Sequence, residues 1–150
     1  MEKARRKQGI RPTSSLVKQA IFNILKDING LAFLDLFAGT GQIGLMAEER
    51  GANVIFVEKN PKFAREITKK TKGKVVISDA IKFLTDTEVK LDIIFADPPY
   101  NYKDYNKLIE LSMKILNEGG ILLIEHSKKS HLNAQDERIY GDTALSIWRK

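Results

Sequence analysis

Short apolar runs alternate with segments of helical periodicity, and this alternation restricts the possible folds more than any other feature of the chain. The apolar runs cover residues 32–38, 53–57, 74–77, 91–96 and 121–124. Apolar spacing and helix-start residues predict intervening helices over about 15–29, 42–50, 60–72, 80–84 and 105–116. Strands that are apolar on both faces and separated by helices form a parallel sheet covered on two sides. The sequence therefore predicts an α/β protein.

The C-terminal segment follows a different pattern. Residues 137–140 and 143–148 read as two strands joined by a tight Gly141-Asp142 turn, which makes them antiparallel. We therefore expect a Rossmann-like, doubly wound sheet of about seven strands, with an antiparallel hairpin at one edge. A length of 150 residues suits one domain. We interpret residues 1–150 as that domain, with residues 1–10 as a basic N-terminal arm.

Composition excludes several classes of site and location. The chain has no cysteine, which removes disulfides, thiolate zinc sites and cysteine nucleophiles, and its two histidines are too few for a histidine-rich metal site. We expect no metal. No apolar run approaches the roughly 20 residues of a membrane span, and the first residues are no secretory signal. The sequence thus indicates a cytoplasmic protein with no membrane partner.

The net charge of +6 is unevenly distributed. Residues 1–18 carry six basic side chains against one acidic side chain, and a second basic stretch covers residues 59–74. Basic clusters attract the phosphates of nucleic acids, although a solvated protein face has the same composition. Charge alone therefore leaves both interpretations open.

A glycine-rich segment, Gly39-Thr40-Gly41-Gln-Ile-Gly44, follows the first predicted strand and precedes a helix. Its G-x-G-x-x-G pattern fits a nicotinamide dehydrogenase, with Glu58 at about the expected distance. Asp35 argues against that class, because a carboxylate beside the glycine loop would repel a pyrophosphate. A ligand with an ammonium and a sulfonium group would be attracted instead. S-adenosylmethionine is such a ligand. Binding of NAD in preference to S-adenosylmethionine would instead favour the dehydrogenase.

Two further carboxylates follow neighbouring predicted strands. Glu58 ends the second strand, where it can accept hydrogen bonds from both ribose hydroxyls of the cofactor. Asp79 follows the third strand, where it can accept from the adenine amino group or cap the next helix. Together with Asp35, these side chains are expected to line one crevice at the carboxyl ends of the strands.

The segment Asp97-Pro98-Pro99-Tyr100 follows the fourth predicted strand. Its prolines remove amide donors and leave carbonyl acceptors. Asp97 and the Pro98 carbonyl could accept both hydrogens of an exocyclic amino group, which directs the nitrogen lone pair at an activated methyl group. Tyr100 could stack on the extruded base. The alternative is an ordinary Pro-Pro turn. Tyr102 fits the lip of a base pocket or a surface aromatic equally well.

From about residue 9 to its end, the chain resembles the RsmD family of bacterial methyltransferases, which modify the exocyclic N2 of a guanine in small-subunit ribosomal RNA. The segments that carry the resemblance are Arg11-Pro-Thr-Ser, Ala20-Ile-Phe-Asn23, Asp35-Leu-Phe-Ala-Gly-Thr-Gly41, Glu58, Asp79-Ala80, Asp97-Pro-Pro-Tyr100 and Tyr140-Gly-Asp-Thr-Ala-Leu145.

The resemblance implies a seven-stranded methyltransferase fold, S-adenosylmethionine as cofactor, and a monomer acting on ribosomal RNA or a small-subunit assembly intermediate. It implies Asp97, Pro98 and Tyr100 as catalytic residues. Implied cofactor contacts are Asp35, Phe37, Gly39, Thr40, Gly41, Glu58, Asp79, Ala80 and Asp97. Implied substrate contacts are Arg11, Thr13, Tyr100 and Tyr102.

Two other functions share part of this pattern. An adenine-N6 methyltransferase acting on DNA or RNA would use the same Asp-Pro-Pro-Tyr chemistry, because the motif recognises an amino group and not a whole base. A non-catalytic RNA-binding protein with a vestigial pocket would keep the basic charge without turnover.

Overall fold

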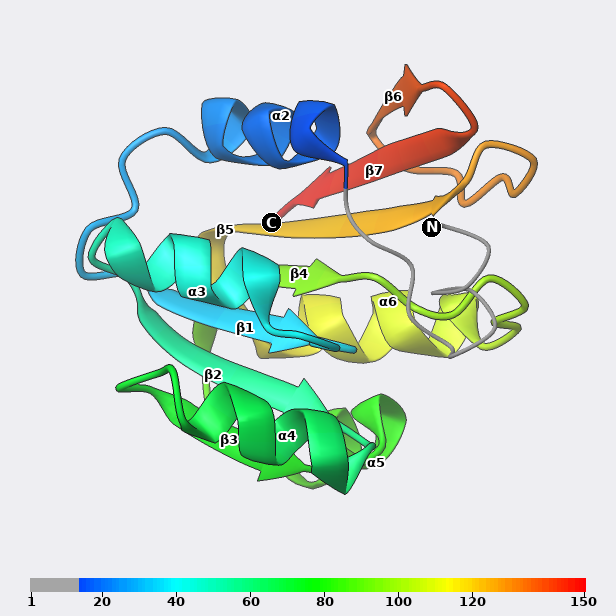
Figure 1. Ribbon diagram of the computed structural model, residues 1–150. Helices are drawn as coiled ribbons and strands as arrows, with labels where there is room; N and C mark the ends of the chain where they lie inside the picture. Colours follow the sequence, from blue (N-terminus) through cyan, green and yellow to red (C-terminus); the bar gives the residue numbers. More distant parts are fainter. Residues whose placement is uncertain (1–13) are drawn as a thin grey trace.

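The computed structural model describes residues 14–150, and its strands form one mixed sheet in the order β3-β2-β1-β4-β5-β7-β6 (Figure 1). Strands β1 to β5 pair in parallel with one another, whereas β7 runs antiparallel to both β5 and β6. The expected α/β sheet with an antiparallel edge hairpin is therefore confirmed. The strands are β1 (Ala32–Leu36), β2 (Asn53–Glu58), β3 (Lys74–Ile77), β4 (Leu91–Ala96), β5 (Leu116–Ser127), β6 (Asp136–Tyr140) and β7 (Thr143–Arg149).

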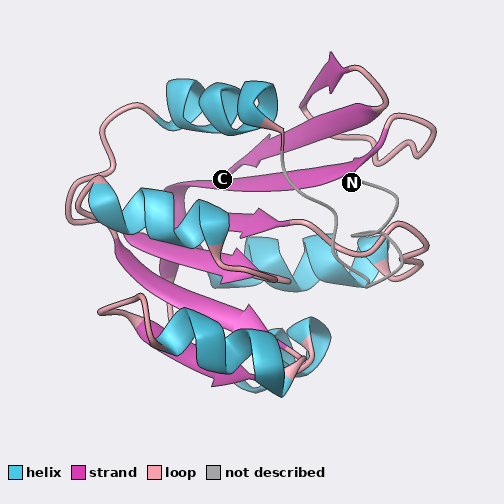
Figure 2. Ribbon diagram, viewed as in Figure 1, coloured by secondary structure: helices cyan, strands magenta, loops and turns pink. Residues whose placement is uncertain are grey.

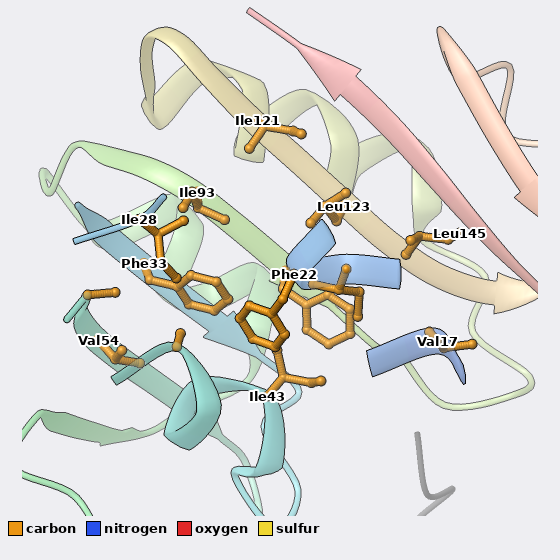
Figure 3. Close-up of a cluster of buried hydrophobic side chains, with 14 of the residues drawn as sticks. Val17, Phe22, Ile28, Phe33, Ile43, Val54, Ile93, Ile121, Leu123 and Leu145 are labelled. Carbon is orange, nitrogen blue, oxygen red and sulfur yellow. The ribbon is translucent and has the colours of Figure 1, made fainter. Parts of the chain in front are cut away.

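Helices cover both faces of the sheet (Figure 2). They are α2 (Ser15–Leu25), α3 (Gln42–Glu49), α4 (Pro61–Thr68), α5 (Ala80–Asp86) and α6 (Tyr105–Ile115). One hydrophobic cluster joins α2, α3 and α4 to the strands, and a second cluster joins α5 and α6 to the opposite face. Figure 3 shows part of the first cluster, which includes Phe22 of α2 and Phe33 of β1. The core is thus two apolar layers separated by the sheet.

Helices α2 and α4 begin at the capping residues that the sequence indicates and end earlier than expected, whereas α5 extends to Asp86, beyond the expected residue 84. The Ser14 hydroxyl accepts from the Val17 amide at 3.1 Å, which caps α2. Helix α2 ends at Leu25 and not near residue 29, because Lys26 leaves the helical conformation with a positive φ (61°), while its amide donates to the Phe22 carbonyl. Helix α4 ends at Thr68 and not at residue 72.

Strand β5 is longer than the predicted 121–124. Its residues 121–127 pair with β7, and Leu116 pairs with Leu91 of β4. The prediction was too short because it followed only the apolar run, whereas ladder hydrogen bonds to β7 extend the strand to Ser127. Conversely, β1 ends at Leu36 and not at residue 38, because Phe37 adopts a left-handed conformation (φ 57°). Both strand ends lie at the edge where the site forms.

Candidate active site

Strand parity places three carboxylates on one face of the sheet. Asp35 pairs with Phe56 of β2 and Phe95 of β4, and both phenylalanines belong to the core under α2, α3 and α4. Glu58 and Asp97 follow these phenylalanines by two residues, so a strand periodicity of two directs them to the same face. Strands β1, β2 and β4 are neighbours, and their carboxyl ends meet at one edge.

The charges of Glu58 and Asp97 act on Asp35. Asp35 is only 2% exposed, and burial raises its pKa well above the ordinary aspartate value. A hydrogen bond from the Gly44 amide opposes this shift, whereas the neighbouring charges of Asp97 and Glu58 raise the pKa further. A cation placed among the three carboxylates would relieve the repulsion between them.

Asp35 also holds the start of α3. The residue before this helix, Gly41, is left-handed (φ 79°) and offers no side-chain cap. Asp35 Oδ2 instead accepts from the Gly44 amide at 3.0 Å and satisfies one of the unpaired donors of the first turn. The glycine loop is therefore fixed to β1 through the same carboxylate that faces the site.

Position 44 requires glycine because neighbouring side-chain atoms lie too close to leave room for a Cβ. A Cβ at this position would lie 2.3 Å from Phe56 Cε2 and 2.9 Å from Asp35 Oδ2. Alanine is normally the better helix residue, by roughly 0.5–1 kcal/mol. Here the clash with the fully buried Phe56 ring outweighs this preference for alanine. We therefore expect Gly44→Ala to lower the free energy of unfolding by about 1–3 kcal/mol.

Urea unfolding of Gly44→Ala and of Glu49→Ala, an exposed position in the same helix, tests this expectation. The Gly44 variant should unfold at lower urea than the wild type and should also bind the cofactor more weakly, because Asp35 must move. Equal or greater stability than the wild type would show that the first turn of α3 tolerates a side chain.

Glu58 connects the second strand to the glycine loop. One carboxylate oxygen accepts from the Gly39 amide at 2.7 Å, and the other accepts from the Asn60 amide at 2.7 Å. These two bonds fix the direction of the carboxylate. A carboxylate has about four lone-pair positions, so two acceptor positions remain for ligand hydroxyls.

The loop between β1 and α3 has the features of a small-ligand cradle. Gly39 is left-handed (φ 59°), and among residues 14–150 no atom lies within 4 Å of where its Cβ would be. Thr40 is exposed, and Phe37 takes the left-handed conformation that costs a non-glycine residue about 1–2 kcal/mol. Gly41, in contrast, is packed so closely against Ile67 that a Cβ would lie at 2.9 Å. Open space beside a carboxylate-rich loop fits a cationic cofactor without phosphates.

Asp79 is a helix cap in the structure. Its Oδ2 accepts from the Lys82 amide at 3.1 Å at the start of α5, and Ala80 is the buried first residue of that helix. The structural alternative for Asp79 is therefore confirmed, while contact of Asp79 and Ala80 with a cofactor stays a prediction. The charge of Asp79 acts on Tyr102, which places these two side chains near each other.

The Asp97–Tyr100 turn follows β4, directly beside β1. Asp97 is half-buried, Pro98 is buried, and Tyr100 is 53% exposed. The amide of Tyr102 donates to the Pro99 carbonyl at 3.0 Å, which closes the turn. The turn thus holds the half-buried Asp97 next to the carboxyl end of β4 and exposes the ring of Tyr100 to solvent.

Tyr102 is not a surface aromatic. Its ring makes edge contacts with Phe37 at 5.3 Å and with Tyr105 at 5.2 Å, and Tyr105 in turn contacts His126 at 6.2 Å. Burial, with smaller effects from the nearby groups Asp104, Asp79 and Tyr105, raises the pKa of Tyr102 to about 12. This aromatic row joins the glycine loop to the Asp97–Tyr100 turn. Sequence reasoning missed it because its members come from separate elements.

Two predicted substrate contacts, Arg11 and Thr13, lie outside the described residues. Within residues 14–150, no group of three or more histidine, aspartate or glutamate side chains is arranged to hold a metal ion. No helix among the same residues is long and apolar enough to cross a membrane.

Comparisons with known proteins agree with this geometry. The family model described as "Conserved hypothetical protein 95" matches residues 3–149. The chain is 30% identical to "Putative rRNA methyltransferase YlbH" of Bacillus subtilis over 93% of this chain and 88% of that protein. It is 31% identical to "Ribosomal RNA small subunit methyltransferase D" of Escherichia coli, over 78% of this chain and 61% of that protein.

A solved structure, "Putative methyltransferase yhhF from Escherichia coli", superposes with a TM-score of 0.81 at 26% identity, covering 95% of this chain and 90% of that one. The strand order, the antiparallel β7 and the glycine loop after β1 thus define a class I methyltransferase fold. The chain belongs to the Conserved hypothetical protein 95 family, which bears out the resemblance to RsmD-type methyltransferases.

Proposed function

We propose that this protein is an S-adenosylmethionine-dependent methyltransferase that modifies the exocyclic N2 of a guanine in small-subunit (16S) ribosomal RNA. The observation that carries the proposal is the set of three carboxylates, Asp35, Glu58 and Asp97, on one face at the carboxyl edge of a methyltransferase fold. The names of the E. coli and B. subtilis relatives support ribosomal RNA as the substrate. We further propose that the chain acts as a single-domain monomer in the cytoplasm.

The cofactor site is assigned to β1, β2 and the glycine loop. Asp35 would face the ammonium group, Glu58 would accept from the ribose hydroxyls, and Asp79 with Ala80 would border the adenine. Phe37, Gly39, Thr40 and Gly41 would line the cofactor between them. S-adenosylmethionine supplies, when bound, a methyl group already activated by its sulfonium.

The reaction centre is assigned to the turn after β4. Asp97 and the Pro98 carbonyl would accept the two hydrogens of the guanine amino group, which frees the nitrogen lone pair for the methyl carbon. The Asp97 carboxylate would stabilise the positive charge that develops on the attacking nitrogen and would accept the proton that this nitrogen releases after it is methylated. The exposed ring of Tyr100 would stack on the base, and Tyr102 would support it from below.

Labelled S-adenosylmethionine and small ribosomal subunits from cells that lack the corresponding activity test this proposal. Nucleoside analysis should show the label on N2-methylguanosine. Label only on N6-methyladenosine would support the adenine alternative, and absence of label on both naked RNA and assembly intermediates would refute a ribosomal RNA substrate. Preferential binding of NAD in calorimetry would instead favour a dehydrogenase.

The basic N-terminal arm gives a separate prediction. Residues 1–8 contain four basic side chains and one acidic side chain. Deleting them should weaken RNA binding and reduce its salt slope by up to about 3, at about 0.7 for each phosphate that is no longer neutralised. RNA affinity is measured by filter binding across salt concentrations, with calorimetry of the cofactor as the control. Unchanged RNA affinity would mean that the arm is only solvated.

A further inference from the structure

We propose that the exposed basic surface of α4 and its flanking turns binds the phosphate backbone of the substrate RNA next to the segment that enters the active site. This surface, the α4 ridge, consists of Lys59, Lys62, Arg65, Lys69, Lys70, Lys72 and Lys74. The inference rests on the proposed function, because it assigns a second contact for the same RNA.

Charge is concentrated on the ridge. Residues 59–74 contain seven basic side chains and one acidic side chain, so this segment alone carries a net charge of +6, equal to that of the whole chain. All seven basic side chains are exposed. A surface of this density attracts phosphates and releases their counterions on binding.

The helix geometry places the central charges on one side. Ala64 and Ile67 are buried against the sheet. Lys62, Arg65 and Lys69 follow the spacing i, i+3 and i+7, so they form one stripe along the outer face of the helix. At about 1.5 Å per residue, the eight-residue helix presents this stripe over about 12 Å, a length that reaches several successive phosphates.

Within residues 14–150, only one of the seven basic side chains forms an ion pair, and the Glu48 carboxylate accepts from the Lys72 and Gly73 amides beside them. Glu66 is the single acidic residue in the segment, and it pairs with Lys69 at 3.1 Å while both side chains remain exposed. The hydrogen bond and charge of Lys69 lower the pKa of Glu66, and the charges of Lys70 and Lys62 lower it further. Several cations therefore act on one carboxylate, and most of the positive field is available to a ligand.

The position of the ridge connects it to the active site. Helix α4 starts directly after Glu58, at the carboxyl edge of the sheet, and runs back along the face that it shares with α3 (Figure 1). Lys59 and Lys62 lie at the end nearest the site, whereas Lys70 and Lys72 follow the far end of the helix. An RNA strand that leaves the site across β2 would meet the ridge along its length.

The absence of an apolar centre favours nucleic acid over a protein partner. Protein interfaces have a desolvated apolar core with aromatic anchors. Among residues 59–74 none of the large hydrophobic side chains is exposed, and the ridge offers only charged and polar groups. Phosphate is the chemistry that such a surface matches.

A charge-matched pair of variants tests the proposal. The ridge variant carries Lys62→Ala, Arg65→Ala and Lys69→Ala. The control carries Lys82→Ala on α5, Lys90→Ala in the segment before β4 and Lys114→Ala on α6. It removes the same charge from exposed positions. Alanine keeps the helix propensity high. A third variant, Lys62→Arg with Arg65→Lys and Lys69→Arg, keeps the charge of the ridge.

Binding of naked 16S ribosomal RNA is measured for each protein from 50 to 300 mM salt. The ridge variant should reduce the salt slope by about 2, at about 0.7 for each neutralised phosphate, whereas the control and the charge-keeping variant should match the wild type. Cofactor affinity should be unchanged in all. Equal losses of RNA affinity in ridge variant and control, or no loss in either, would overturn the proposal. RNA binding is measured separately from methyl transfer. A wild-type protein that binds RNA but transfers no methyl group would therefore refute the proposed function and leave the proposal for the α4 ridge standing.

Discussion

Replacing Asp97 by asparagine is expected to lower kcat for methyl transfer by about 10²–10³-fold, the usual cost of losing a charge-stabilising group at the reaction centre. The asparagine amide keeps the size of the side chain but removes the negative charge that stabilises the attacking nitrogen. The amide NH₂ is also a hydrogen-bond donor, so it cannot accept a hydrogen from the amino group of the base. Single-turnover transfer from labelled S-adenosylmethionine measures the loss, and cofactor calorimetry and RNA binding should change far less than kcat.

Asp104→Asn is the matched control for this experiment. Asp104 is an exposed carboxylate that follows the same turn and makes no capping bond to α6. This variant should transfer methyl groups at the wild-type rate. Full activity of Asp97→Asn would contradict the catalytic role and would favour a binding protein with a vestigial pocket.

Asp35→Asn is expected to weaken cofactor binding by about 10- to 150-fold, because a hydrogen bond to a charged group contributes about 1.5–3 kcal/mol. The neutral side chain can still accept from the Gly44 amide, so the start of α3 should persist. Calorimetry with S-adenosylmethionine gives the affinity directly. Unchanged affinity would remove Asp35 from the cofactor site.

The same substitution should change how stability depends on pH. Burial raises the pKa of Asp35 above its unfolded value, so the folded chain holds a proton that the unfolded chain releases. The free energy of unfolding of the cofactor-free protein therefore falls as pH rises from the ordinary aspartate range through the raised pKa. Asp35→Asn lacks this fall, and above that window it should be at least as stable as the wild type.

Asp92 offers a control with similar chemistry at the opposite edge of the sheet. Its Oδ2 accepts from the Ala32 amide at 2.8 Å, much as Asp35 accepts from Gly44, but it lies at the start of β4. Asp92→Asn should leave cofactor affinity unchanged. An equal loss of affinity in both variants would mean that the effect is a general weakening of the fold.

Much of the fold and the approximate site could be predicted because most of the parallel strands contain a short apolar run between helix signals. The position of Asp35 beside the glycine loop and of Asp97 beyond β4 then followed from parallel topology alone. Strand parity carries a further signal of the site. Once Phe56 and Phe95 are known to share a face, the two-residue spacing to Glu58 and to Asp97 places both carboxylates on that face as well.

Other features depend on contacts that no local pattern reports. The left-handed Phe37 ends β1 early, and its ring then meets Tyr102 from a loop 65 residues further along the chain. Likewise, the burial of Asp35 requires Gly44 to bring the backbone of α3 against the strand. These arrangements arise from packing between distant segments, so composition and periodicity do not specify them.

The central claim is methylation of guanine N2 in small-subunit ribosomal RNA, and nucleoside mass spectrometry of that RNA from cells with and without this protein tests it most directly. We predict that N2-methylguanosine decreases by one residue per small subunit when the protein is absent, and that the wild-type chain restores it while Asp97→Asn does not. An unchanged N2-methylguanosine content, or a loss of N6-methyladenosine instead, would contradict the claim.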